Sequence, residues 1–438
     1  MKIITRLLSF CLAFLLSVTT LMPSVALASP SLDPKQQMFI FSMIAYTIAD
    51  RKGTQEELQE LLTVRATEIL NTPSIQKDIG DWDVVWGPVV YQNPSSDLDT
   101  NSMYVARDGN HYVVAITGTN PLSLYDWFLE DFYVKKQVDW TYGEIPSDLQ
   151  PKISQGTAIG LNILQSMESS GQTLLEFLSE TVQNSADAIE ITFTGHSLAG
   201  ALSPTLALAV FEQRSEWAGD KPVKISVFPY AGLTPGNEDF SAYYDSQLGA
   251  STTRVWNDID LVPHVWNEAM LSEIPSLYEP EIEPGLAIKL LTRLGKDRAK
   301  DGHYTQLLPA TPGLPGQVSN KTICKQLNTS TVFSSKEVSQ IVEDLKGKIS
   351  QDSELREISS FLDREVDHFL EDFVGNLITF LLEVTYQHVT EYATLLNVEE
   401  PYCTINAETG GIFLPTETYQ LEQLALRLLL EYKNILSE

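Results

Sequence analysis

A serine stands at the junction between two segments of contrasting pattern. Residues 189–196 alternate apolar and polar side chains, as a β-strand does, and residues 198–211 are rich in Ala and Leu, which favours a helix. Ser197 lies between them. A sharp strand-to-helix turn exposes the serine hydroxyl, and the helix N-terminus offers free N–H groups to a developing oxyanion. The pattern predicts a nucleophilic serine, with a helix-capping serine in a buried turn as the alternative.

Such a turn needs small neighbours, because the strand and the helix approach each other closely. Gly195, Ala199 and Gly200 supply them. The usual pattern around a nucleophilic serine is G-x-S-x-G, and Ala199 stands where the second glycine is usual. Alanine is still small, so we expect the turn to form.

A hydrolytic serine needs a base and a carboxylate that orients the base. Asp258 and Asp260 both follow a predicted strand at residues 252–256. Active sites of α/β proteins form at the C-terminal ends of strands, so both carboxylates are placed for this role. The residues alone leave the choice between them open, and a solvated turn residue is the alternative for either.

Six histidines compete for the role of base. Four are poorly placed, because they precede the serine in a hairpin, adjoin it within the turn, closely follow the acidic turn or lie in the middle of a helix: His111, His196, His264 and His368. His303 follows Asp260 after a short spacing that suits a compact fold, whereas His388 lies across a predicted helical region. A surface histidine or a buried structural one is the alternative for both.

The surrounding pattern predicts an α/β fold. Strands are expected at residues 82–91, 102–107, 112–116, 189–196, 223–230 and 252–256, and helices at residues 34–70, 147–169 and 174–182. Asp108-Gly109-Asn110 is a hairpin signal. The alternation of strands and helices indicates a sheet that is mostly parallel in its later part. Residues 120–134 are aromatic-rich and amphipathic, which suits either a lid over an apolar site or an ordinary packed helix.

Composition narrows the class of protein. The chain has 438 residues, 43% of them hydrophobic, which is enough for a large core. Its 58 acidic residues outnumber 29 basic ones. This balance disfavours nucleic acid and anionic membranes as electrostatic partners and favours solubility. No metal-ligand spacing is present, so we expect neither a metal nor another cofactor.

The N-terminus has the pattern of a signal peptide. Lys2 and Arg6 flank a short apolar run at residues 7–18, and Ala26-Leu27-Ala28 is a cleavage signal. We therefore expect removal of residues 1–28 and a secreted or periplasmic mature domain at residues 29–438, with an uncleaved anchor as the alternative. Two cysteines would remain, and an oxidising compartment permits a disulfide between them (Cys324 and Cys403).

Three stretches together resemble the class 3 lipase family. The elbow around Ser197 resembles its G-H-S-L-G-G signature, and residues 115–131 resemble its R-G-T strand end with a D-W-x-x-D segment. Residues 257–263 resemble its N-x-x-D-x-V-P turn. The match runs over residues 80–270 in the right order. Thr117 replaces the usual arginine and Ala199 the usual glycine, and the first change bears on how the oxyanion loop is held.

The resemblance implies roles for particular residues. It makes Asp260 the acid of a triad with Ser197, and it gives the backbone N–H groups of Leu198 and Thr119 to the oxyanion hole. The context of His388, with Gln387 before it and Tyr392 and Leu395-Leu396 after it, resembles the last histidine segment of bacterial relatives. We therefore favour His388 as the base, and His303 stays as the alternative.

The resemblance also implies fold and activity. We expect an α/β-hydrolase-type mixed, mostly parallel sheet flanked by helices, with a mainly helical insertion or cap at residues 305–380. The expected reaction is hydrolysis of carboxylic esters of lipids, without a cofactor. The expected partners are a lipid or ester substrate and, transiently, a lipid interface. A phospholipase, a short-chain esterase and a catalytically silent lipid-binding protein are the alternatives.

Overall fold

The computed structural model describes residues 30–49, 51–93, 101–118, 134–318, 323–324, 335–351, 366–409 and 418–437. The predicted signal peptide and nearly all of the expected lid lie outside the described residues. None of the helices within these ranges combines the length and the apolar character needed to cross a bilayer.

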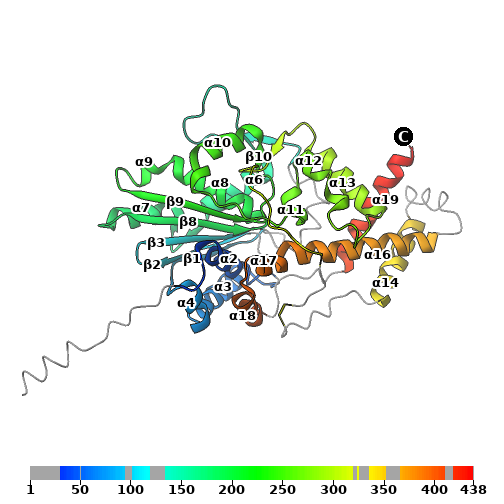
Figure 1. Ribbon diagram of the computed structural model, residues 1–438, viewed down its shortest axis with the longest axis horizontal. Helices are drawn as coiled ribbons and strands as arrows, with labels where there is room; N and C mark the ends of the chain where they lie inside the picture. Colours follow the sequence, from blue (N-terminus) through cyan, green and yellow to red (C-terminus); the bar gives the residue numbers. More distant parts are fainter. Residues whose placement is uncertain are drawn as a thin grey trace, which may run out of the picture.

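A five-stranded mixed sheet forms the centre of the fold (Figure 1). In spatial order its strands are β1 (Asp83–Tyr91), β2 (Asn101–Asp108), β3 (His111–Thr117), β8 (Ile189–His196) and β9 (Val223–Tyr230). The first three pair antiparallel, and β3, β8 and β9 run parallel. The expected hairpin is confirmed, since Asp108 pairs with His111. Because β3, β8 and β9 are parallel, their C-terminal ends lie side by side at the same end of the sheet.

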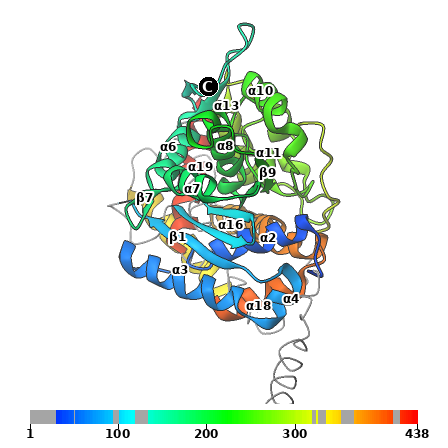
Figure 2. The same cartoon turned by 90° about the vertical axis from the view of Figure 1, so that its left-hand side faces the viewer.

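Helices cover both faces of this sheet (Figure 2). One face carries α2 (Pro34–Ala45), α3 (Gln55–Leu70), α4 (Pro73–Ile79) and α18 (Glu399–Thr409). The other carries α6 (Gln155–Ser166), α7 (Leu174–Asn184), α8 (Leu198–Glu212), α9 (Arg214–Trp217) and α10 (Glu238–Leu248). A hydrophobic cluster lies on each face of the sheet. Side chains alternate along β3, so Val113 packs into the first cluster, on the α2 face, and Val114 into the second, on the α8 face.

Local capping explains two differences from the expected helices. Residues 34–70 are helical over most of their length but form two helices, because Thr54 starts a new helix by forming a capping box with Glu57. The helix expected at residues 147–169 begins only at Gln155, because β5 (Lys152–Ser154) precedes it and Ser154 caps it.

Short strands and turns complete the α/β part. A four-stranded sheet is formed by β4 (Gln137–Asp139), β5, β10 (Gly236–Asn237) and β11 (Tyr304–Thr305). A two-stranded sheet is formed by β6 (Glu168–Ser169) and β7 (Gln172–Thr173). The strand expected at residues 252–256 is not regular. Thr252 and Val255 form only isolated parallel bridges to β9, because the chain leaves the sheet toward the acidic turn.

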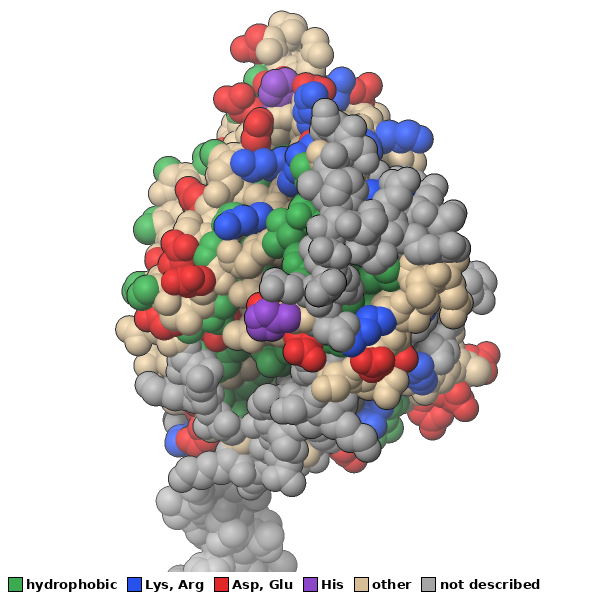
Figure 3. Space-filling view, turned by 90° about the vertical axis from the view of Figure 1, so that its right-hand side faces the viewer, with side chains coloured by type: hydrophobic (Ala, Val, Ile, Leu, Met, Phe, Trp, Pro, Cys, Tyr) green, Lys and Arg blue, Asp and Glu red, His purple; other side chains and the backbone are tan. Residues whose placement is uncertain are grey.

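A third hydrophobic cluster lies beyond the C-terminal ends of these parallel strands, and its helices are at the right of Figure 1. It comprises side chains of α13 (Leu286–Ala299), α14 (Ser335–Gln351), α16 (Val366–Thr385) and α19 (Thr418–Ser437), and it includes Ala201 of α8. This end of the molecule shows hydrophobic, basic and acidic side chains interspersed (Figure 3). The cluster thus joins the later helices to the helix that follows the serine.

The chain returns from this cluster to the sheet through α16. A π-helical turn (Tyr386–Thr390) follows α16 directly and continues into α17 (Glu391–Leu395) and then α18. A disulfide between Cys324 and Cys403 joins α18 to residues 323–324. The π-helical turn therefore lies between the third cluster and the face of the sheet that α2 covers.

Candidate active site

The predicted elbow is present, with Ser197 as its single junction residue. β8 ends at His196 and α8 begins at Leu198. Ser197 has φ 63° and ψ −126°, a backbone conformation that L-residues rarely adopt and that is typical of functional sites. Its N–H donates to the Tyr230 carbonyl at 3.0 Å, and its carbonyl accepts from Gly200 N at 2.8 Å. These bonds hold the turn against the end of β9.

Close backbone contacts explain the small residues of the elbow. A Cβ on Gly195 would lie 2.6 Å from the Ala199 carbonyl oxygen, and one on Gly200 would lie 2.3 Å from the Tyr230 carbonyl oxygen. Ala199 itself is fully buried. The departure from the usual second glycine is tolerated here because Gly195 opposite it has no side chain.

The acidic turn brings one of the two candidate aspartates inside. Asp260 is fully buried and caps the short helix α11 (Leu261–His264), where its Oδ1 accepts from Val262 N at 3.0 Å. Asp258 is exposed, and its Oδ1 accepts from Gly316 N at 2.8 Å. Asp260 is therefore the candidate that faces the interior.

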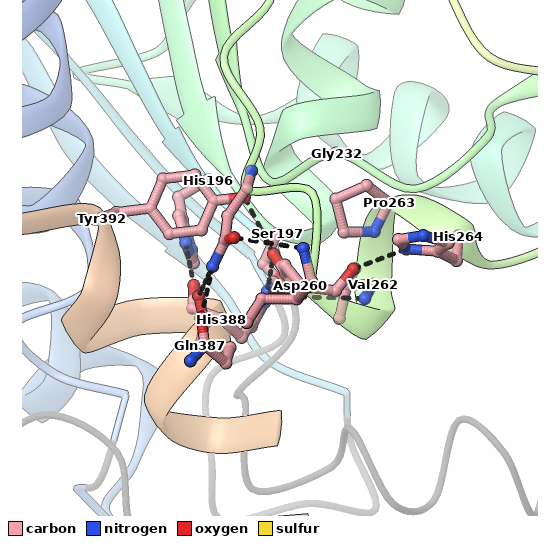
Figure 4. Close-up of polar contacts among 12 residues, drawn as sticks. His196, Ser197, Gly232, Asp260, Val262, Pro263, His264, Gln387, His388 and Tyr392 are labelled. Carbon is pink, nitrogen blue, oxygen red and sulfur yellow. Dashed lines mark hydrogen bonds and ion pairs between the residues drawn. The ribbon is translucent and has the colours of Figure 1, made fainter. Parts of the chain in front are cut away.

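His388 lies between Asp260 and Ser197 (Figure 4). It comes from the π-helical turn, and its Nδ1 lies 2.9 Å from Asp260 Oδ2 while its Nε2 lies 2.8 Å from Ser197 Oγ. The exposed fractions of the three residues are 0%, 0% and 1%. A carboxylate accepts only, so Nδ1 carries the proton and Nε2 is the acceptor for the serine hydroxyl.

The other histidines have different surroundings. His303 is exposed in a turn, where its carbonyl accepts from Glu238 N. Of the remaining ones, His111 contacts Thr192 Oγ1 and His196 contacts the His388 carbonyl. His264 contacts the Asp260 carbonyl, and His368 contacts Asp372 Oδ2. The structure thus brings His388, and not His303, to the serine.

A buried polar network surrounds the three residues. Tyr392 Oη donates to Asp260 Oδ2 at 2.9 Å and accepts from Asn257 N at 2.9 Å. Asn257 Nδ2 donates to the Gln387 carbonyl and side-chain oxygens, at 3.1 and 2.7 Å. Sequence reasoning did not assign these contacts, although Tyr392 follows His388 by one helical turn and Asn257 stands in the acidic turn. That spacing is the signal that was available.

Burial sets the protonation of the neighbours of the site. It lowers the pKa of His196 well below the ordinary value, and the adjacent His388 ring lowers it further. It also lowers the pKa of His264. Burial raises the pKa of Tyr392 well above the ordinary value, and the Asp260 charge raises it further. Around neutral pH these side chains are therefore neutral hydrogen-bonding groups.

The candidate oxyanion site is described on one side. Leu198 is the first residue of α8, so its N–H is among the free donors of that helix N-terminus. Thr119 lies outside the described residues, but Gly118 before it is described. A Cβ on Gly118 would lie 2.4 Å from Leu198 Cβ and 2.9 Å from Ala199 N. The end of β3 therefore lies directly against the start of α8.

Known proteins resemble this chain in sequence and fold. Residues 113–270 match the family described as Lipase (class 3). The crystal structure of M37 lipase is 30% identical with a TM-score of 0.67, over 85% of this chain and 95% of that chain. More distant are lipase II from Rhizopus niveus (18% identity, TM-score 0.39, 54% and 76% of the two chains) and Lip2 lipase from Yarrowia lipolytica (15%, 0.35, 54% and 75%).

No curated protein matches the chain. The similarity to M37 lipase extends over nearly the whole of that protein, and the family match covers the strand, elbow and acidic turn described above. The chain therefore belongs to the class 3 lipase family and is a carboxylic ester hydrolase.

Proposed function

We propose that the chain hydrolyses carboxylic esters of lipids, with Ser197 as nucleophile, His388 as general base and acid, and Asp260 as the carboxylate that orients His388. One observation carries the proposal: the buried, continuous line of contacts from Ser197 Oγ through both His388 nitrogens to Asp260 Oδ2, at 2.8 and 2.9 Å. A serine hydroxyl is a poor nucleophile unless a base removes its proton as it attacks.

The reaction follows from these positions. Ser197 Oγ attacks the ester carbonyl carbon while His388 Nε2 takes its proton, and the carbonyl oxygen becomes an oxyanion. His388 then gives that proton to the departing alcohol, which leaves an acyl-serine. Water then attacks the acyl carbon while His388 Nε2 takes its proton. The bond between the acyl carbon and Ser197 Oγ breaks, His388 returns the proton to Oγ, and the fatty acid is released. Asp260 stabilises the imidazolium in both halves and holds its Nδ1–H.

The oxyanion would be stabilised by backbone donors. Leu198 N–H at the start of α8 is one, and the N–H of Thr119, the residue directly after Gly118 in the sequence, is proposed as the second. Removal of one such donor lowers the rate by an amount equivalent to about 3–4 kcal/mol. The close approach of Gly118 to Leu198 Cβ supports this pairing, because it aligns the two donor segments.

The substrate class is proposed from the family and from the similarity to M37 lipase. Acyl chain length depends on the pocket walls, and the proposal covers triacylglycerol, phospholipid and short-chain esters as competing substrates. A series of p-nitrophenyl esters from acetyl to palmitoyl, with a phospholipid alongside, separates them by their kcat/KM values.

The test of the mechanism is a comparison of four proteins. Ser197→Ala and His388→Ala should each lose at least about 10⁴-fold in kcat on a p-nitrophenyl ester, whereas His303→Ala keeps the activity of the unsubstituted protein. A fluorophosphonate should label the unsubstituted protein and not Ser197→Ala. Full turnover by Ser197→Ala would refute the mechanism, and absence of both labelling and turnover would favour a silent lipid-binding protein.

We further propose that the protein is exported and loses residues 1–28, on the signal pattern at its N-terminus. N-terminal sequencing of the protein from the periplasm or medium should begin at Ser29. Recovery of a chain that starts at Met1 would contradict cleavage.

A further inference from the structure

The backbone that carries His388 has an unusual conformation. Residues Tyr386–Thr390 form a π-helical turn between α16 and α17. A π-turn is rare, because its backbone bonds skip one residue further than those of an α-helix, and it is found mostly at functional sites. Contacts from outside the helix must therefore favour it over the regular alternative.

Two consecutive carbonyl groups of this turn accept bonds from side chains elsewhere in the chain. The Gln387 carbonyl accepts from Asn257 Nδ2 at 3.1 Å. The His388 carbonyl accepts from His196 Nε2 at 2.7 Å (Figure 4). Both donors are fully buried. These bonds act on the backbone of the turn and not on the His388 ring.

The donors come from the segments that hold the other two proposed catalytic residues. His196 directly precedes Ser197, and Asn257 stands three residues before Asp260 in the acidic turn. The segment that supplies Ser197 to the His388 ring thus also supplies the His196 bond to the backbone of the turn. The segment that supplies Asp260 to the ring likewise supplies the Asn257 bond. We call the His196 and Asn257 bonds the backbone clamp.

The surroundings of His196 fix which nitrogen donates. Its ring is enclosed by aromatic side chains with centroids 4.7–6.3 Å away: Phe39, Tyr46, His388 and Tyr392. Among the residues that the structure describes, its buried Nδ1 has no hydrogen-bond partner. A carbonyl accepts only, so the proton is on Nε2 and Nδ1 is left bare. Because burial and the His388 ring lower its pKa, His196 remains in this neutral form.

We propose that His196 is a positioning residue of the hydrolase: its neutral Nε2–H, together with Asn257, clamps the π-helical turn so that His388 Nε2 stays within reach of Ser197 Oγ. The proposal rests on the proposed function, because it assigns His196 an effect on catalysis through His388. A displacement of about 1 Å in a catalytic group can lower the rate about 100-fold.

Two amide variants test the reach of the donor with matched chemistry. His196→Gln places an amide nitrogen at about the distance of Nε2, and His196→Asn carries the same amide one methylene too short. We expect His196→Asn to lose about 10- to 100-fold in kcat with KM nearly unchanged, and His196→Gln to recover most of that loss. Equal kcat values for the two variants, at whatever level, would overturn the proposal.

The Asn257 arm is tested by a double-mutant cycle. Asn257→Ser keeps a short oxygen for the turn but cannot reach the Gln387 carbonyl. If the two bonds hold one element, the effects of His196→Asn and Asn257→Ser on kcat are not multiplicative, and the double variant loses less than their product. Independent, multiplicative effects would contradict a shared clamp.

The tautomer of His196 can be measured in the unsubstituted protein. In protein labelled with ¹⁵N-histidine, His196 should show a protonated Nε2 and an unprotonated Nδ1 from pH 6 to 8. The opposite tautomer or an imidazolium would overturn the clamp. Failure of the proposed function is distinguishable, because it appears either as activity retained by Ser197→Ala or His388→Ala, or as an unsubstituted protein that neither hydrolyses the ester nor reacts with the fluorophosphonate. If those variants are inactive and His196→Asn keeps full kcat, only the clamp falls.

Discussion

The hydroxyl of Tyr392 lies between the buried carboxylate of Asp260 and the backbone of Asn257, 2.9 Å from each. It donates to Asp260 Oδ2, and its raised pKa keeps the proton on the phenol in the working range of pH. Tyr392 comes from α17, one turn after His388. The same short segment thus supplies both the ring that contacts Asp260 and a second donor that holds the carboxylate in place.

Tyr392→Phe should therefore weaken both activity and stability. The change removes a hydrogen bond to a buried charged group, worth about 1.5–3 kcal/mol, and leaves Asn257 N without its acceptor. We expect about a tenfold fall in kcat/KM on a p-nitrophenyl ester, measured together with urea unfolding. Tyr104→Phe is the control. Tyr104 lies on β2, and its buried hydroxyl donates to the Phe41 carbonyl at 3.0 Å, not to a residue of the site. It should lose stability without losing activity; an equal loss of activity in both would contradict a local role.

Gly200→Ala should damage the elbow. The three atoms nearest to an added Cβ are backbone atoms, among them the Tyr230 carbonyl oxygen at 2.3 Å and Gly232 Cα at 2.7 Å, and these atoms cannot rotate away. Overpacking of this kind lowers the free energy of unfolding by about 1–3 kcal/mol, and here it also moves Ser197. Thermal unfolding and ester hydrolysis measure the two effects.

A second glycine provides the matched control for that substitution. Gly375 lies inside α16, and no atom of the described part of the chain lies within 4 Å of a Cβ added there. Gly375→Ala should raise the free energy of unfolding by about 0.5–1 kcal/mol, because alanine favours a helix interior. If Gly200→Ala were as stable and active as Gly375→Ala, the close approach of α8 to β9 would not matter.

The local parts of the site were predictable from the sequence. The strand, the serine and the Ala-rich helix stand next to one another, so their pattern alone indicated the elbow. Residues 257–260 are likewise one short turn, although the choice of Asp260 over Asp258 rested on resemblance. Burial explains that choice in the structure: Asp260 caps α11 inside, whereas Asp258 bonds to Gly316 at the surface.

The long-range contacts were not predictable in the same way. His388 lies 191 residues after Ser197, and neither spacing nor composition states that α16 returns the chain to the sheet. The bonds of Asn257 and His196 to the π-helical turn depend on the packing of three separate segments. A disulfide between Cys324 and Cys403 was open for the same reason, since their distance is set by the fold of the chain between them.

Acidification should destabilise the protein below about pH 6.5 through its buried histidines. Burial lowers the pKa values of His111, His196 and His264 in the folded state. Each therefore binds a proton in the unfolded chain first, so stability is present above the ordinary histidine pKa of about 6.5 and is lost as pH falls below it. The slope reaches at most about 1.4 kcal/mol per pH unit for each such histidine.

Urea unfolding at pH 7.5 and 5.5 measures this loss. His111→Gln removes one of the three groups at a site on β3 where the ring contacts Thr192 Oγ1, away from the serine. Its stability should fall less steeply between the two pH values. A protein that becomes more stable on acidification, or a variant with an unchanged slope, would show that these histidines are not the titrating groups.

Arg254→Met should make the protein more stable. Arg254 is 8% exposed, its Nη2 is buried without a hydrogen-bond partner among the residues that the structure describes, and its guanidinium lies over the Trp256 ring at 4.7 Å. Burial lowers its pKa to about 10, so it stays charged at neutral pH. Desolvation of a buried ion costs several kcal/mol, whereas a cation–π contact returns only about 2 kcal/mol.

A methionine of similar length keeps the packing and removes the charge, so the free energy of unfolding should rise by about 1–3 kcal/mol. Arg214→Met is the control, because Arg214 is exposed and lies over the Phe211 ring at 4.0 Å. An exposed charge keeps its hydration, so that variant should change by less than about 0.5 kcal/mol. Chemical unfolding of both at pH 7 decides the comparison. A loss of stability in Arg254→Met larger than in Arg214→Met would mean that the buried cation contributes a favourable interaction to the fold.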